Sequence, residues 1–168
     1  MIVTVGYNFM RHTLQIENQT LDFSYKENAN CWQTVAIIDN VEIEIEIDFA
    51  FHRQSNIDWQ HFIDFFKFIS VKNRLQELAH CGIPLISEVG KTFFRRSLHE
   101  IKDWKMMFKN SIFYNGKVDE HNQKDKFSFS ILYDYFIKKD GRIDGDAYGL
   151  YIVDVENLQI VGARRNQC

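Results

Sequence analysis

The chain has 168 residues, a net charge of -3 and a hydrophobic content of 45%, values typical of a soluble protein that folds as a single domain over residues 1–168. This charge excludes a general nucleic-acid binder, which needs an excess of lysine and arginine. No apolar run approaches the roughly 18 residues of a membrane-spanning helix, so we expect no membrane partner.

Three cysteines, Cys31, Cys81 and Cys168, lie far apart and form no CxxC pair. An odd number of separated cysteines favours reduced thiols over a disulfide framework or a zinc site. The N-terminal residues lack the features of a secretory signal peptide. We therefore expect a cytoplasmic protein with no metal site and no cofactor.

Short strands are predicted at Ile2–Val5, Thr13–Ile16 and Leu21–Tyr25, and a β-hairpin is predicted from Trp32 to Phe51. Each strand is bounded by polar residues. Inside the hairpin, Asp and Asn at positions 39 and 40 suit a tight turn because both tolerate positive φ.

The second strand of this hairpin, Val41–Phe49, alternates strictly between apolar and acidic side chains. Successive side chains of a strand point to opposite faces, so this pattern predicts one buried and one exposed face. The exposed face carries carboxylates and no cation, and its members are Glu42, Glu44, Glu46 and Asp48.

After the hairpin, the apolar residues have the spacing that is typical of a helix. Ser55 and Asp58 form a pattern like a capping box at the start of a helix, and apolar residues then recur at intervals of three and four over residues 59–69. The pattern continues through Ala79, in the same helix or after a bend, and Gly82 and Pro84 are predicted to end it. A second helix is predicted from Ser97 to Phe108.

Asn115-Gly116 is predicted to form a hairpin turn, and Asp140–Asp146 a second, acidic turn. Further strands are predicted at Phe127–Ile137, Tyr148–Val155 and Leu158–Ala163. The resulting fold class is α+β: antiparallel sheet from N-terminal and C-terminal meanders, with two to three helices inserted between them and packed on one face.

No catalytic motif is evident, which favours a protein without enzymatic activity. Gly90-Lys91-Thr92 lacks the first glycine of a phosphate-binding loop, because position 85 is a leucine. The acidic turn has Arg142 where a calcium loop needs an oxygen ligand. A hydrolase whose site is assembled only by the fold stays open as a less favoured alternative.

The order of these features resembles small bacterial domains of unknown function, several of which are found beside polymorphic toxins as immunity proteins. The resemblance rests on Trp32, Val41–Phe49, Asp140-Gly141, Asp144-Gly145 and Tyr148-Gly149-Leu150-Tyr151. It implies a binding protein and assigns no functional residue.

The leading hypothesis is a non-enzymatic protein-binding domain of the immunity or antitoxin kind, with a basic toxin as the partner that it favours. The binding residues would be Glu42, Glu44, Glu46 and Asp48, with Asp144 and Asp146 as a second acidic spot.

The alternative is a regulatory or small-molecule-binding domain with a tyrosine-rich pocket, formed by Tyr133, Tyr135, Tyr148 and Tyr151. A sheet edge, at Ile2–Val5 or Leu158–Ala163, could also pair with a second copy, which leaves a homodimer open.

Overall fold

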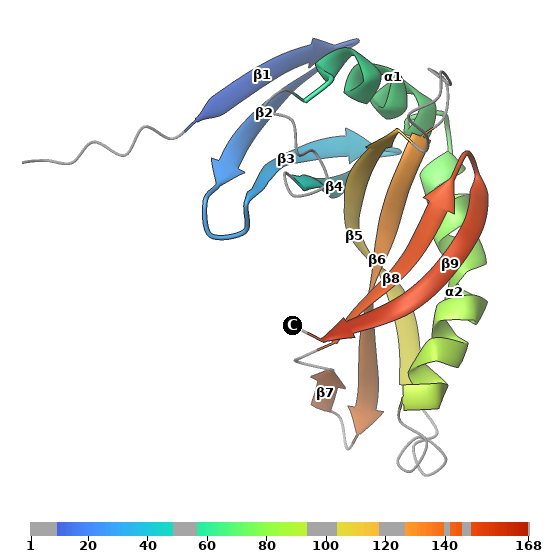
Figure 1. Cartoon of the computed structure of the whole chain (residues 1–168). Helices are drawn as coiled ribbons and strands as arrows, with labels where there is room; N and C mark the ends of the chain where they lie inside the picture. The colour runs from blue at the N-terminus through green and yellow to red at the C-terminus, as the bar shows by residue number, and fades with distance from the viewer. Residues whose placement is uncertain are drawn as a thin grey trace, which may run out of the picture.

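The computed structural model describes residues 10–48, 57–93, 104–117, 127–139, 142–145 and 149–167 (Figure 1). Strands precede and follow a pair of helices in the chain. The elements are β1 (Arg11–Ile16), β2 (Gln19–Lys26), β3 (Cys31–Ile38), β4 (Val41–Asp48), α1 (Trp59–Ile69), α2 (Arg74–Phe93), β5 (Trp104–Lys117), β6 (Phe127–Lys139), β7 (Arg142–Gly145), β8 (Gly149–Glu156) and β9 (Gln159–Gln167).

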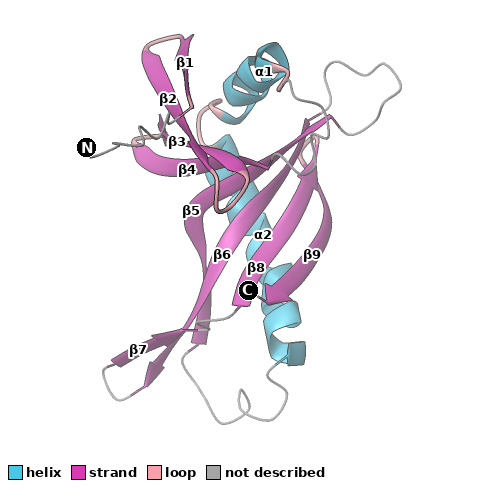
Figure 2. Ribbon diagram, turned by 60° about the vertical axis from the view of Figure 1, so that its left-hand side comes forward, coloured by secondary structure: helices cyan, strands magenta, loops and turns pink. Residues whose placement is uncertain are grey.

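The described strands form one sheet in the order β1-β2-β3-β4-β5-β6-β8-β9, and β7 pairs with β6. Every pairing is antiparallel except that of β4 with β5, which is parallel. A parallel pair needs a crossover connection, and the segment carrying α1 and α2 supplies it (Figure 2). The predicted α+β class is confirmed, and the sheet differs from a wholly antiparallel one at this single seam.

The hairpin of β3 and β4 has the predicted register and turn. Val41 pairs with Ile38, and Asp39 and Asn40 occupy the turn with φ of 51° and 62°. Ile43, Ile45 and Ile47 are buried completely and Val41 partly, whereas the glutamates between them point to the other face. The strict alternation in the sequence therefore describes the strand correctly over Val41–Asp48; Phe49 lies outside the described residues.

α1 covers the predicted apolar repeat over residues 59–69, and the part of the repeat that runs on to Ala79 continues after a bend, in α2. Ser55 of the predicted capping pattern lies outside the described residues. Asp58 caps α1 by accepting a hydrogen bond from the backbone N–H of His61 at 3.0 Å. Its buried stripe is aromatic: the Phe62 ring meets Phe23 of β2 and Tyr114 of β5 edge-on. Such edge-to-face contacts join both halves of the sheet to one helix.

α2 does not end at Gly82 and Pro84, as the sequence predicted, but continues to Phe93 with both residues inside it. Gly82 lies where the helix is close to the sheet, since a Cβ there would clash with the Tyr133 hydroxyl. Pro84 cannot bond to the carbonyl of His80, but both residues are exposed, so water can satisfy that carbonyl. The packing of α2 on the sheet therefore outweighs the low helix propensity of glycine and proline.

The predicted second helix is wrong at its C-terminal end, because Trp104–Phe108 belongs to β5, while residues 97–103 lie outside the described residues. The predicted turn at Asn115-Gly116 is also wrong. Gly116 has a φ of 83° at a register shift inside the long pairing of β5 with β6. One type of β-bulge places a glycine at positive φ, as a tight turn does, so Asn-Gly is compatible with either setting.

The remaining strands match their predicted positions within a few residues at β1, β2, β6, β8 and β9. Ile2–Val5 lies outside the described residues, as do Asp140, Gly141 and Asp146 of the acidic turn. The middle of that turn is the short strand β7. Neither described helix has both the length and the apolar character needed to cross a lipid bilayer.

Gly82→Ala should destabilise the fold by about 1–3 kcal/mol, because overpacking outweighs the helix propensity that alanine adds. The Tyr133 hydroxyl cannot easily move, since it donates to the Ala79 carbonyl at 2.7 Å within the core. Urea denaturation measures the change. Adding Tyr133→Phe should recover part of the loss by removing the clashing oxygen, and an undiminished loss in the double variant would contradict this account.

Leu158→Gly should stabilise the fold by about 1 kcal/mol. Leu158 has a φ of 69° in the turn between β8 and β9 and is 44% exposed, so the strained backbone gains little from burial. The preceding Asn157 also has positive φ, and Asn-Gly is the preferred pair in such turns. Thermal unfolding would show a higher Tm for the glycine variant, whereas Leu158→Ala, which keeps the strain, should show none.

Candidate functional site

The face of β2, β3 and β4 that points away from the helices carries an exposed acidic surface. We call it the acidic face and define it by Asp22, Val35, Ile37, Glu42, Glu44 and Glu46. The register across β3 and β4 places Val35 beside Glu44 and Ile37 beside Glu42. The corresponding face of β6 and β8 is buried at Ser130 and Ile152, so this exposed surface does not continue across the middle of the sheet.

The glutamates of β4 lie in a row, as the sequence predicted, but they differ in exposure. Glu42 is exposed, whereas Glu44 and Glu46 are half-buried. Gln33 of β3 lies between the latter two: its Nε2 donates to Glu44 Oε1 and is 3.5 Å from Glu46 Oε1. Asp48 lies in the strand opposite Cys31, and its side chain is outside the described residues.

Three carboxylates of the acidic face have no cationic partner among the described residues. Within the part of the chain that the structure describes, the carboxylates of Asp22, Glu42 and Glu44 form no ion pair. By contrast, Asp154 on β8 contacts the Arg164 guanidinium. The acidic face therefore presents a field that attracts cations.

Two exposed apolar side chains accompany these carboxylates. Val35 is 56% exposed and Ile37 is 55% exposed, although both lie in the interior of a sheet strand. A single exposed aliphatic residue needs no explanation, but an adjacent pair flanked by carboxylates combines the two components of a protein-binding surface.

A cleft of about 380 Å³ opens on the acidic face between β2 and β3. It is lined by Thr20, Asp22, Ser24, Gln33, Thr34, Val35 and Glu44. Asp22 was not among the predicted site residues, although its position between buried Leu21 and Phe23 indicates an outward side chain. No sequence pattern indicated that the two strands separate here.

The second predicted acidic spot does not join the acidic face. β4 pairs with residues 111–114 of β5, which pair with β6 around Ser130, whereas Asp144 of β7 pairs with Ile137 farther along β6. Figure 1 places β7 at the far end of β6 from β4. Asp146 lies outside the described residues.

The predicted tyrosine cluster lies on the helix-facing side of the sheet. Tyr133, Tyr135 and Tyr151 are buried in the core, and Tyr148 is outside the described residues. Burial raises the pKa of the Tyr133 hydroxyl well above its ordinary value. Burial, reinforced by the carboxylates of Asp58 and Asp64, does the same for Tyr114. In the structure the three described tyrosines of the cluster pack in the core. A small-molecule pocket formed by the tyrosines stays a prediction.

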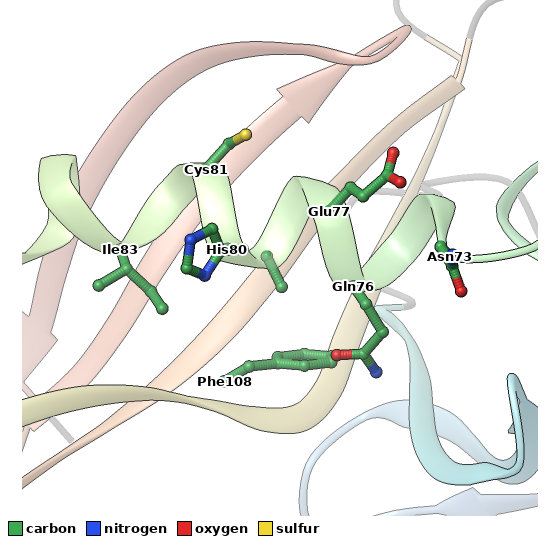
Figure 3. Close-up of a pocket in the computed structure, with 8 residues that line it drawn as sticks. Asn73, Gln76, Glu77, His80, Cys81, Ile83 and Phe108 are labelled. Atoms are coloured by element: carbon green, nitrogen blue, oxygen red, sulfur yellow. The ribbon is translucent and has the colours of Figure 1, made fainter.

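A separate hollow of about 530 Å³ runs between α2 and β5 (Figure 3). Gln76, His80 and Ile83 lie on the side of α2 that faces Phe108, whereas Glu77 and Cys81 point the other way. His80 and Cys81 therefore do not converge as a nucleophile and base would. Among the described residues, no three His, Cys, Asp or Glu side chains are grouped as a metal site requires.

Alkaline pH should unfold the protein through its buried tyrosines. Tyrosine in an unfolded chain ionises near pH 10, and the pKa of Tyr114 and Tyr133 is raised in the fold. Their contribution to stability is fully present below about pH 10 and is lost as pH rises above it. Tyrosinate absorbance and circular dichroism, recorded together, should show these two phenols ionising only as the fold is lost; their ionisation in a folded protein would contradict this.

Comparison with known proteins adds no relative from which a role could be carried over. No protein-family model, no curated protein and no solved structure matches this chain. The resemblance to immunity-associated domains therefore stays an expectation, and function has to be argued from the residues and their geometry.

Proposed function

We propose that this protein is a non-enzymatic binding domain that recognises a cationic surface of another protein through its acidic face. The observation that carries the proposal is that Asp22, Glu42 and Glu44 of the acidic face form no ion pair within the described structure and lie beside exposed Val35 and Ile37. Charge supplies steering toward a basic partner, and the apolar pair supplies surface whose burial stabilises the complex.

The mechanism that these features support is occlusion. A strand in the middle of a sheet holds its side chains rigidly, so the β4 glutamates are ordered before a partner arrives. Glutamates held in a row can occupy a site that another protein uses for phosphate or a different anion. Inhibition of a basic toxin, as an immunity protein performs it, is the form of this function that we favour.

The reduced state of the described cysteines fits the same proposal. Cys31 is buried and Cys81 is exposed, and in the described structure neither is part of a disulfide. Free cysteines suit a reducing compartment, and we place the function in the cytoplasm on that basis.

The proposal is tested by removing negative charge from the acidic face with substitutions that keep the size and shape of the side chains. The triple variant Glu42→Gln, Glu44→Gln and Glu46→Gln should weaken binding of the captured partner by about tenfold or more at low salt. Capture from a lysate of the source cells, identification by mass spectrometry and calorimetry with the purified pair measure the loss.

A matched control removes the same amount of charge from the helices. Asp64→Asn, Glu77→Gln and Glu88→Gln alter three exposed carboxylates of α1 and α2 and should leave the affinity nearly unchanged. Equal losses in both triple variants would show that overall charge, not the acidic face, governs binding. An undiminished affinity in the β4 variant, or a folded bait that binds no protein, would contradict the proposed function.

A further inference from the structure

β2 and β3 separate partway along their length and form a fork in the sheet. Their backbone pairing covers residues 24–26 of β2 and 31–33 of β3. Farther along, the Gln19 carboxamide joins the strands: its Nε2 donates to the Ile37 carbonyl at 2.7 Å, and its Oε1 accepts from the Ile37 N–H at 2.9 Å. The Gln19 side chain thus makes the two hydrogen bonds to Ile37 that the backbone of a paired strand would otherwise make. The space between this contact and the paired residues is the cleft on the acidic face.

Main-chain groups of β3 face this space. Residues two apart on a strand direct their N–H and C=O groups toward the same neighbour, and Ile37 directs both groups at β2. The N–H and C=O of Val35 therefore point into the fork. Opposite them, the Asp22 carbonyl accepts a hydrogen bond from the Thr34 hydroxyl at 3.0 Å. The fork offers a main-chain acceptor in addition to its side chains.

One carboxylate stands on each side of the fork, and each is held in place. Asp22 Oδ1 accepts from the Thr13 hydroxyl at 2.8 Å, and Glu44 Oε1 accepts from Gln33 Nε2. In the described part of the chain, Oδ2 of Asp22 and Oε2 of Glu44 have no hydrogen-bond partner. Val35 lies between the two strands that carry them, so a hydrophobic surface separates two oriented acceptors.

We propose that the fork is the docking site for an arginine side chain carried by an extended segment of the cationic partner. This inference rests on the proposed function and names the point on the acidic face where the partner is anchored. The aliphatic stem of arginine would pack on Val35, and its guanidinium would donate to the carboxylates of Asp22 and Glu44 and to the Val35 carbonyl.

Arginine fits the fork better than lysine does. A guanidinium has five N–H donors in a plane and can bond to acceptors on both sides of a cleft, whereas an ammonium is a compact point charge. The acceptors here stand on two different strands with an apolar residue between them. An extended segment suits the surroundings because Val35 and Ile37 point to one face of the same strand, two residues apart.

The test uses a short blocked peptide in which arginine alternates with valine, titrated into the full-length protein and followed by NMR. We expect the largest shifts at the Val35 and Asp22 amides and at the Gln33 side-chain amide. Asp22→Asn with Glu44→Gln should weaken binding about tenfold, as expected for lost charge-assisted hydrogen bonds. The control Asp64→Asn with Glu77→Gln should bind like the unmodified protein.

Two further measurements separate the fork from diffuse attraction. The same peptide with lysine in place of arginine should bind several-fold more weakly, and equal affinity would overturn the assignment to arginine. Glu42→Gln with Glu46→Gln alters carboxylates of the acidic face that do not line the cleft. If this variant loses as much affinity as the fork variant, or if shifts spread evenly over the face, the fork is overturned while the proposed function stands.

Discussion

β4 is the element on which the rest of the molecule depends, because it has one face in the core and one acidic face. Ile43, Ile45 and Ile47 pack under the helices, and the glutamates between them must then point outward. The strand also joins the two halves of the sheet, since it pairs with β3 on one side and β5 on the other. A slip of one residue in its register would bury the carboxylates and expose the isoleucines, so core and candidate site are specified together.

The parts of the fold that could be predicted are those fixed by nearby residues. The β3–β4 turn and α1 follow from Asp39, Asn40, Asp58 and the spacing of apolar side chains. The errors arose where one residue type serves different structures. Gly82 is typical of the end of a helix and instead allows α2 to approach Tyr133, and Gly116 is typical of a turn and instead lies at a register shift within paired strands. Only the tertiary partner distinguishes these roles, and the sequence does not show the partner.

The candidate site likewise contains residues that could be predicted from the sequence and residues that could not. The β4 row could be predicted because alternation alone places Glu42, Glu44 and Glu46 on one face. Asp22 could not be assigned to the same surface, because that required knowing that β2 lies beside β3 and then separates from it. The separate positions of Asp144 and the β4 glutamates could not be foreseen either, since both depend on how far β5 and β6 extend.

The parallel seam between β4 and β5 also has a consequence for how the chain reaches its structure. Each meander consists of strands that follow one another closely and can pair as soon as a turn closes. The seam joins Glu44 to Ser111 with both helices lying between them in the chain, so it carries the largest loss of loop entropy. We therefore expect two preformed halves to dock late. Until they do, the edges of β4 and β5 are exposed and open to pairing with another chain, which makes this seam the point of greatest aggregation risk during synthesis.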